Sequence, residues 1–319
     1  MKPTVLLTGG FGNIGGRVSS AMSDLQIGQI KLSSRQHRAA PSWAPTALPV
    51  QLDLLSTQSA IASLQDVTQV VHLASMNDID CATDPKLASQ INVTGTKVLL
   101  ESAISQGVSR FIYFSTIHVY GSPLRGHISE ASQTNPVHPY GTTHLSAENL
   151  VIDAHKAGLI EGIILRTSNG FGVPMDPEVR IWQILVNDLC KQAVLTGKLV
   201  LKSDGSQLRN FIPLEDVCGG IIHSLSMSLI ANETPIFNLG SSHSCSVLDM
   251  AQLIAQRCQV VLGFTPPITK SAQSTGESNS DFGFDCNKFN ATGYVPLNHF
   301  ENEVDGLLLF CKKYFDRVK

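Results

Sequence analysis

The chain has 319 residues, of which 43% are apolar and 15% charged, enough to build the core of one large or two modest domains. The formal net charge of −3 argues against nucleic acid as a partner, and no apolar run reaches the length of a membrane span. The seven cysteines form no CxxC pair and have no histidine at metal-ligand spacing. We therefore expect free thiols, no metal site and a cytoplasmic protein without a signal peptide.

The N-terminal segment predicts a dinucleotide-binding turn. Residues 5–7 are an apolar run typical of a strand buried on both faces, and residues 17–21 are helix-like. Between them, Gly9 permits a tight turn, Gly12 lets the main chain approach a pyrophosphate, and Gly15 lets helix and strand pack closely. The helix N-terminus then offers N–H groups and a positive dipole end to phosphates. A simple glycine turn is the alternative.

Residues 30–34 predict the second strand, whose end meets the adenosine ribose in dinucleotide-binding folds. An acid there favours NAD, but this chain has Ser33, Ser34 and Arg35 instead. Hydroxyls and a guanidinium would hold a 2′-phosphate that a carboxylate would repel. The sequence therefore favours NADP(H), with NAD(H) as the alternative, and leaves open that Arg35 is only a solvated loop charge.

Two further strands contribute to the same edge of the predicted sheet. Residues 50–54 predict the third strand, and Asp53 at its end either touches the adenine edge or caps the helix expected over 56–64. Residues 70–73 predict the fourth strand, which runs into HLAS (72–75). Small residues at that tip suit the close passage of a cofactor.

The following segments alternate between helix and strand and are expected as helix 92–106, strand 110–115, a helix from 139 and strand 163–166. Later elements are expected as helix 181–195, strand 199–201, a helix following RNFIPLEDV (209–217), strand 237–240 and helices 247–258 and 300–315. The alternation predicts an α/β protein with a Rossmann-type doubly wound parallel sheet. We expect an NAD(P)-binding domain over 1–166 and a smaller α/β substrate-binding domain over 167–319, with segments crossing between the two.

Two hydroxyl side chains are candidates for chemistry. Thr116 ends the strand that begins at residue 110, and Tyr140 starts the helix after the next loop. Ligands of open parallel sheets gather at the carboxyl ends of the strands, so both side chains are placed to meet over a nicotinamide. A tyrosine with a lowered pKa can act as general acid or base, and a neighbouring hydroxyl can orient a carbonyl or alcohol. This is the chemistry of hydride transfer between alcohols and ketones.

The chain resembles the extended short-chain dehydrogenases/reductases of the NAD(P)-dependent epimerase/dehydratase group, which act mostly on nucleotide sugars. Eight segments carry the resemblance in the family order: TGGFGNIG (8–15), HLAS (72–75), NVTGT (92–96), FSTIHVYG (114–121), PYGTTHLSAE (139–148), LRTSNGFG (165–172), RNFIPLEDV (209–217) and FNLGS (237–241).

The resemblance implies roles for individual residues. Thr116 matches the catalytic Ser/Thr and Tyr140 the catalytic Tyr, while Asn169 and Arg209 match contacts to the pyrophosphate or sugar. Asp216 matches an acid with a structural role at the start of a domain-bridging helix. Together with the glycine turn and the strand tips, the expected cofactor contacts are Gly9, Phe11, Gly12, Asn13, Ile14, Gly15, Ser33, Ser34, Arg35, Asp53, Leu54, Leu73, Ala74, Ser75, Asn92, Tyr140 and His144, and the expected substrate contacts are Ser115, Thr116, Asn169 and Arg209.

One departure from the family pattern concerns the residue four positions after Tyr140. The family has Lys there and this chain has His144, which lies on the same helix face as Tyr140. A largely neutral imidazole can donate to the nicotinamide ribose but is a poor source of positive charge for Tyr140. We expect His72 to pack inside a strand, and we assign no catalytic role to His118, His127 or His138.

Two functions remain open. The first is an active epimerase or reductase; dehydration is disfavoured because Ile117 and His118 replace the acidic pair of the family's dehydratases. The second is a catalytically weak or inactive NADP(H)-binding protein, which the loss of the lysine supports. The family's pairing of the helices from residues 92 and 141 also implies a homodimer, unless their apolar stripes only face the sheet.

Overall fold

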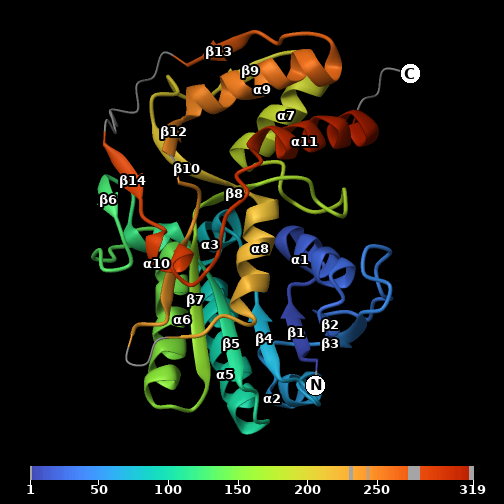
Figure 1. Ribbon diagram of the computed structural model, residues 1–319, viewed down its shortest axis with the longest axis vertical. Coiled ribbons are helices and arrows are strands. Elements are labelled where there is room, and N and C mark those ends of the chain that lie inside the picture. The colour runs from blue at the N-terminus through green and yellow to red at the C-terminus, as the bar shows by residue number, and fades with distance from the viewer. Residues whose placement is uncertain (1, 230–232, 243, 272–280, 316–319) are drawn as a thin grey trace.

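The computed structural model describes residues 2–229, 233–242, 244–271 and 281–315. Figure 1 shows a sheet domain and, above it, a smaller lobe built largely from the second half of the chain. The seven parallel strands of the main sheet are, in spatial order, β11 (Ile236–Leu239), β7 (Glu161–Thr167), β5 (Arg110–Thr116), β4 (Gln69–His72), β1 (Thr4–Thr8), β2 (Gln29–Ser34) and β3 (Leu48–Gln51). This arrangement confirms the predicted α/β fold.

Helices cover both faces of the main sheet, which explains why its strands are nearly continuous apolar runs. One face carries α1 (Asn13–Asp24) and α8 (Leu214–Ser224). The other carries α2 (Thr57–Ser63), α5 (Gly95–Ser105) and α6 (Pro139–Lys156). Both α8 and the edge strand β11 come from beyond residue 166, so the chain returns to the sheet domain after it has entered the lobe.

The lobe packs three helices around a second core: α7 (Leu185–Thr196), α9 (Val247–Leu262) and α11 (Phe300–Phe315). Its small sheets are β12 (Ser244–Ser246), β10 (Leu208–Pro213) and β8 (Asn169–Phe171); β13 (Ile268–Lys270) with β9 (Leu199–Leu201); and β14 (Phe282–Phe284) with β6 (Gly126–Ile128). The remaining elements are α3 (Asp78–Thr83), α4 (Pro85–Ala88), the π-helical turn η1 (Ser89–Thr94), the 3-10 turn η2 (Ile117–Tyr120) and α10 (Asn287–Asn290).

Several predicted boundaries differ from the structure; the helix predicted over 247–258, for example, continues to Leu262. The predicted strand 50–54 lies at residues 48–51, although the Leu52 amide still donates to the Ser34 carbonyl and keeps the chain extended. The predicted helix 92–106 begins in the π-helical turn and becomes an α-helix only at Gly95. The helix predicted over 181–195 begins only at Leu185. Ile181 lies in the irregular segment before it and is buried there, so its apolar character does not require a helix.

Two buried carboxylates tie the lobe to the sheet domain. Glu303 of α11 accepts two hydrogen bonds from Arg17 of α1, at 2.6 and 3.2 Å. Asp216 in the first turn of α8 accepts from the amides of Leu297 and Asn298, at 2.6 and 2.9 Å. Asp216 is therefore used inside the structure, as its family resemblance implies. These contacts hold the segment around α11 over the carboxyl edge of the main sheet.

None of the helices in the described part of the chain is long and apolar enough to cross a membrane. All seven cysteines are described, and all are free thiols.

Candidate active site

The glycine turn between β1 and α1 is shaped by close backbone contacts. Gly9 has a φ of +68°, and a Cβ there would lie 3.1 Å from the backbone nitrogen of Ala74. A Cβ on Gly15 would lie 2.1 Å from the carbonyl oxygen of Gly9. The turn therefore requires glycine at both positions, and it leaves the first amides of α1 facing a cavity lined by Gly12 and Asn13. This is the cradle that a dinucleotide pyrophosphate needs.

A cavity of about 1100 Å³ opens on one side of the turn, and we call it the cofactor cavity. Its lining includes the predicted residues Gly9, Phe11, Gly12, Ser33, Ser34, Arg35, Asp53, Leu54, Leu73, Ala74 and Ser75. The Arg38 guanidinium also lines it and stacks over the Phe11 ring, 5.0 Å from the ring centroid. Two cations, Arg35 and Arg38, therefore lie at the end of β2, which is the strand end that meets the adenosine ribose in dinucleotide-binding folds.

Asp53 lies in the cofactor cavity and is not a helix cap. Its Oδ1 accepts from the Leu55 amide at 3.0 Å. The cap of α2 is Ser56, whose hydroxyl accepts from the Ser59 amide at 3.2 Å. The prediction that Asp53 caps this helix is therefore wrong. Ser56, three residues later, lies closer to the first free amides of α2 and caps the helix instead.

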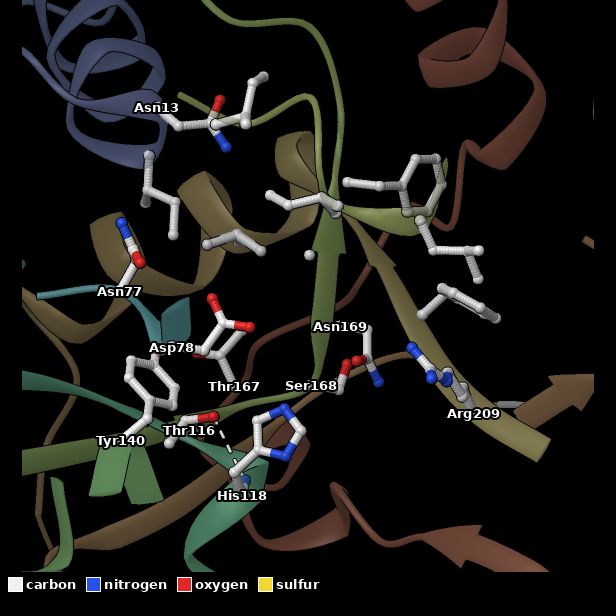
Figure 2. A pocket seen from close by; sticks show the side chains of 18 of the residues that line it. Asn13, Asn77, Asp78, Thr116, His118, Tyr140, Thr167, Ser168, Asn169 and Arg209 are labelled. Atoms are coloured by element: carbon white, nitrogen blue, oxygen red, sulfur yellow. Dashed lines mark hydrogen bonds between the residues drawn. The ribbon is translucent and has the colours of Figure 1, made fainter. Parts of the chain in front are cut away.

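A second cavity of about 680 Å³ shares Gly9, Gly12, Leu73 and Ser75 with the cofactor cavity, so the two form one cleft. We call it the substrate cavity. It contains the predicted residues Asn13, Ile14, Gly15, Ser115, Thr116, Tyr140, Asn169 and Arg209. Figure 2 shows Thr116 and Tyr140 next to each other, with Asn169 and Arg209 across the cavity.

Local structure explains how Thr116 and Tyr140 meet. Thr116 is the last residue of β5, and its Oγ1 accepts from the His118 amide at 3.3 Å as η2 begins. Tyr140 is the second residue of α6, where His138 caps the helix through Nδ1, which accepts from the Tyr140 amide, and Pro139 starts the first turn. Burial and the nearby Asp78 carboxylate raise the pKa of Tyr140, and a hydrogen bond with Thr116 opposes that rise.

His144 lies behind Tyr140 and lines neither cavity. It is 2% exposed, its ring centroid is 4.4 Å from that of Tyr140, and its Nδ1 bonds to the hydroxyl of Tyr113 at 2.9 Å. Its Nε2 is buried and has no hydrogen-bond partner among the described residues. Burial lowers the pKa of His144 to about 3, so the imidazole is neutral at physiological pH. The structure places the His144 imidazole beside the Tyr140 ring and outside both cavities. The expected contact of His144 with the nicotinamide ribose stays a prediction.

His72 is packed inside β4, as predicted. It is 1% exposed, and both ring nitrogens have partners: the hydroxyl of Thr8 at 2.7 Å and that of Thr96 at 3.0 Å. Burial lowers its pKa to about 3. His72 and His144 are thus two neutral buried imidazoles, of which only His144 keeps an unpartnered nitrogen.

A buried ion pair supports the end of β5, and sequence reasoning missed it. Glu148 accepts from Arg166 at 2.7 Å and from the Ser115 hydroxyl at 2.5 Å, and both members of the ion pair are at most 3% exposed. Ser115 borders the substrate cavity, but its hydroxyl points to Glu148. The signal was present, because Tyr140, His144 and Glu148 follow each other at four-residue spacing on one face of α6.

Two predicted asparagines make internal hydrogen bonds. Asn92 is 1% exposed, accepts from the Met76 amide at 2.8 Å and donates to Thr143, and it lines neither cavity. These bonds fix the segment after HLAS, and the expected contact of Asn92 with the cofactor stays a prediction. Asn169 does line the substrate cavity, and its side-chain amide donates to the Asn210 carbonyl at 2.8 Å.

Two further side chains project into the substrate cavity without having been assigned a role: Asp78 and His118 (Figure 2). Asp78 begins α3 and follows the HLAS tip by three residues, which is the signal that a cavity-lining position was near. His118 lies in η2 rather than in an irregular loop, and burial lowers its pKa. His138 and His127, which also have no assigned catalytic role, have partners elsewhere: His138 caps α6, and His127 lies 3.3 Å from Asp285.

Two curated relatives match nearly the whole chain. The low-salt glycan biosynthesis protein Agl12 of Haloferax volcanii is 25% identical over 321 residues, covering 98% of both chains. The UDP-glucose 4-epimerase of Lactobacillus helveticus is 27% identical, covering 94% of both chains.

Solved structures share the fold over nearly the whole chain. The UDP-glucose 4-epimerase of Thermotoga maritima, solved with UDP-glucose, has a TM-score of 0.81 at 21% identity and covers 97% of this chain and 99% of its own. The UDP-glucuronic acid 4-epimerase of Bacillus cereus, solved with NAD, has a TM-score of 0.80 at 24% identity, covering 97% and 96%.

The family model described as the NAD dependent epimerase/dehydratase family matches residues 5–240, which is well over half of the chain and includes the glycine turn, Thr116 and Tyr140. As the eight sequence motifs predict, the chain belongs to the NAD-dependent epimerase/dehydratase family.

Proposed function

We propose that the protein is an NAD(P)-dependent epimerase or reductase that acts by hydride transfer on a nucleotide sugar or a related small carbonyl or alcohol compound. The observation that carries this proposal is that Thr116 and Tyr140 line the same cleft as the glycine turn. The names of the relatives support the substrate class, since they act on or are solved with UDP-sugars.

Each residue then has a defined task. The backbone around Gly9 and Gly12 would hold the pyrophosphate of the cofactor, and the bound cofactor would supply the hydride-transfer chemistry. Thr116 orients the reacting oxygen, and Tyr140 gives or takes its proton. Arg209, across the cavity, supplies a positive charge for the diphosphate of the substrate.

For the cofactor we propose a preference for NADP(H), with NAD(H) as the alternative. Ser33, Ser34 and Arg35 line the cofactor cavity, and Arg38 stacks beside them over Phe11. Hydroxyls and guanidinium groups suit a 2′-phosphate. The names of the similar solved structures mention NAD, so the proposal distinguishes this chain from those proteins.

A weak or inactive binding protein is the second candidate. The raised pKa of Tyr140 and the neutral, buried His144 favour it, because neither helps a phenolate to form. In this case the cleft would bind cofactor and nucleotide sugar without turning them over.

We also propose a homodimer formed through α5 and α6. These helices cover the same face of the sheet, so their outer sides can pair with a second copy about a two-fold axis. Their apolar residues, such as Leu99 and Val151, pack against the sheet, which is the alternative explanation given above for the apolar stripes. The proposal of a dimer therefore rests on the family resemblance. Solution scattering should give a mass near twice 34.4 kDa, and a monomer mass at micromolar concentration would contradict the dimer.

The test of function is to incubate the protein with nucleotide sugars and either NAD⁺ or NADPH, and to follow products by NMR. An epimerase changes one stereocentre without net cofactor consumption, whereas a reductase consumes NADPH. Tyr140→Phe should reduce the rate by about 100-fold or more while cofactor binding persists, because it removes the proton-transfer group and keeps the ring. Binding without turnover in wild type and variant alike would favour the binding protein instead.

A further inference from the structure

The carboxylate of Asp78 is the one acidic side chain among the described residues that line the substrate cavity. Figure 2 shows it beside Thr116 and Thr167, directed into the space in front of Tyr140. Within the described part of the chain, the structure records no hydrogen bond or ion pair for this carboxylate. The next acid on the same helix differs, because Asp80 accepts from the side-chain amide of Asn77 at 2.9 Å. The Asp78 carboxylate is therefore available to a ligand.

The substrate cavity is lined by the Asp78 carboxylate and by two guanidinium groups, those of Arg180 and Arg209. Asp78 lies at the Tyr140 end and Arg209 at the other, with His118 in between (Figure 2). The electrostatics agree with this placement, since Asp78 raises the pKa of His118 whereas Arg209 lowers it. A diphosphate therefore has its favourable position at the Arg209 end, which leaves the sugar at the Asp78 end.

Proton transfer does not explain an acid at this position. Asp78 raises the pKa of Tyr140, which opposes formation of the phenolate. An acid that works against the catalytic tyrosine and has no partner of its own is better explained by what it does to the ligand. A carboxylate accepts hydrogen bonds from hydroxyl or ammonium groups and repels another carboxylate, and both effects are strengthened when water leaves the cavity.

We propose that Asp78 determines substrate specificity by selecting a nucleotide sugar that is neutral or carries an amine, and by disfavouring a nucleotide uronic acid. The inference rests on the proposed function and names its substrate class. The family contains both kinds of enzyme by name, since similar structures include a UDP-glucose 4-epimerase and a UDP-glucuronic acid 4-epimerase.

The test is calorimetric titration of the cofactor-loaded protein with UDP-glucose and UDP-glucuronic acid, repeated with the corresponding thymidine diphosphate pair. Wild type should prefer the neutral sugar by at least about tenfold, which corresponds to about 1.4 kcal/mol. Asp78→Asn keeps the size and removes the charge, so it should reduce this preference to about threefold or less by improving binding of the uronic acid. Raising the salt concentration should reduce the wild-type preference and leave that of Asp78→Asn unchanged.

Asp66→Asn is the matched control. Asp66 is exposed in the turn before β4, at the opposite end of that strand from the cavity, and has a positive φ that asparagine tolerates. This control should keep the full wild-type preference. Equal binding of both sugars to wild type, or the same preference in wild type and Asp78→Asn, overturns the role of Asp78. Failure of all four ligands to bind overturns a uridine or thymidine diphosphate sugar as the substrate class, which is the part of the proposed function on which this inference rests, so the two failures are distinguishable.

Discussion

The two halves of the cleft are built by different parts of the chain. The cofactor cavity is defined near its centre by backbone: the glycine turn, the first amides of α1 and the tips of the parallel strands. The substrate cavity is defined by side chains that come from separate elements, namely Thr116, His118, Tyr140, Asp78 and Arg209. A site formed by the backbone depends on a local glycine pattern. A site formed by side chains can change its chemistry through single substitutions while the fold stays the same.

The largest expected effect breaks the backbone half. Gly15→Ala places a methyl group against the Gly9 carbonyl, so the turn must move. Cofactor affinity should fall by about 100-fold, or about 2.7 kcal/mol, measured by calorimetry. Gly107→Ala is the control, because Gly107 has no atom within 4 Å of the added Cβ, although unlike Gly15 it has a positive φ. It should lose about 1 kcal/mol of stability and keep its cofactor affinity. A Gly15→Ala protein with wild-type affinity would contradict the backbone account.

A second test concerns the two neutral histidines beneath the substrate half. His72 and His144 have pKa values lowered to about 3, against about 6.5 in an unfolded chain. Between these values the unfolded state binds more protons, so stability is complete above pH 6.5 and is lost as pH falls. At pH 5 each histidine should cost about 2 kcal/mol of unfolding free energy. Urea denaturation of wild type and His144→Gln should show a smaller loss in the variant; identical pH dependence would contradict the buried neutral state of His144.

A smaller effect should come from restoring the family's lysine. We expect His144→Lys to raise the rate of hydride transfer at neutral pH by about tenfold, because a cation next to Tyr140 favours the phenolate. The rate of His144→Ala, measured at a temperature where both variants are folded, shows what the imidazole side chain contributes to hydride transfer. A fast wild type with a slower lysine variant would mean that the imidazole is an effective group in its own right, fixed by Tyr113.

The smallest effect concerns cofactor choice. Arg35→Asp should weaken NADPH relative to NADH by a few-fold to about tenfold, because it introduces the carboxylate that repels a 2′-phosphate. Lys198→Asp makes the same charge reversal at an exposed position in the lobe and should leave the ratio unchanged. A wild type that prefers NADH would remove the basis for the prediction.

The two halves also differ in how far sequence predicts them. The turn around Gly9 was predictable because its geometry excludes side chains. The positions of Thr116 and Tyr140 were predictable because eight motifs occur in the family order. The Glu148–Arg166 pair and the inward direction of Asp78 depend on contacts between distant elements, which local periodicity does not encode. Contacts between distant elements also explain why α7 was predicted to start too early. Ile181 lies in a loop and is apolar because its side chain is buried, not because it belongs to the helix.

The pairing of Arg17 with Glu303 has a consequence for the order in which the molecule is completed. The two partners are separated by 286 positions, and Arg17 follows directly on the glycine turn. During synthesis the glycine turn is made before α11, so its neighbouring guanidinium acquires its carboxylate only after 286 further residues have been added. Until then helix α1 lacks this anchor to the lobe.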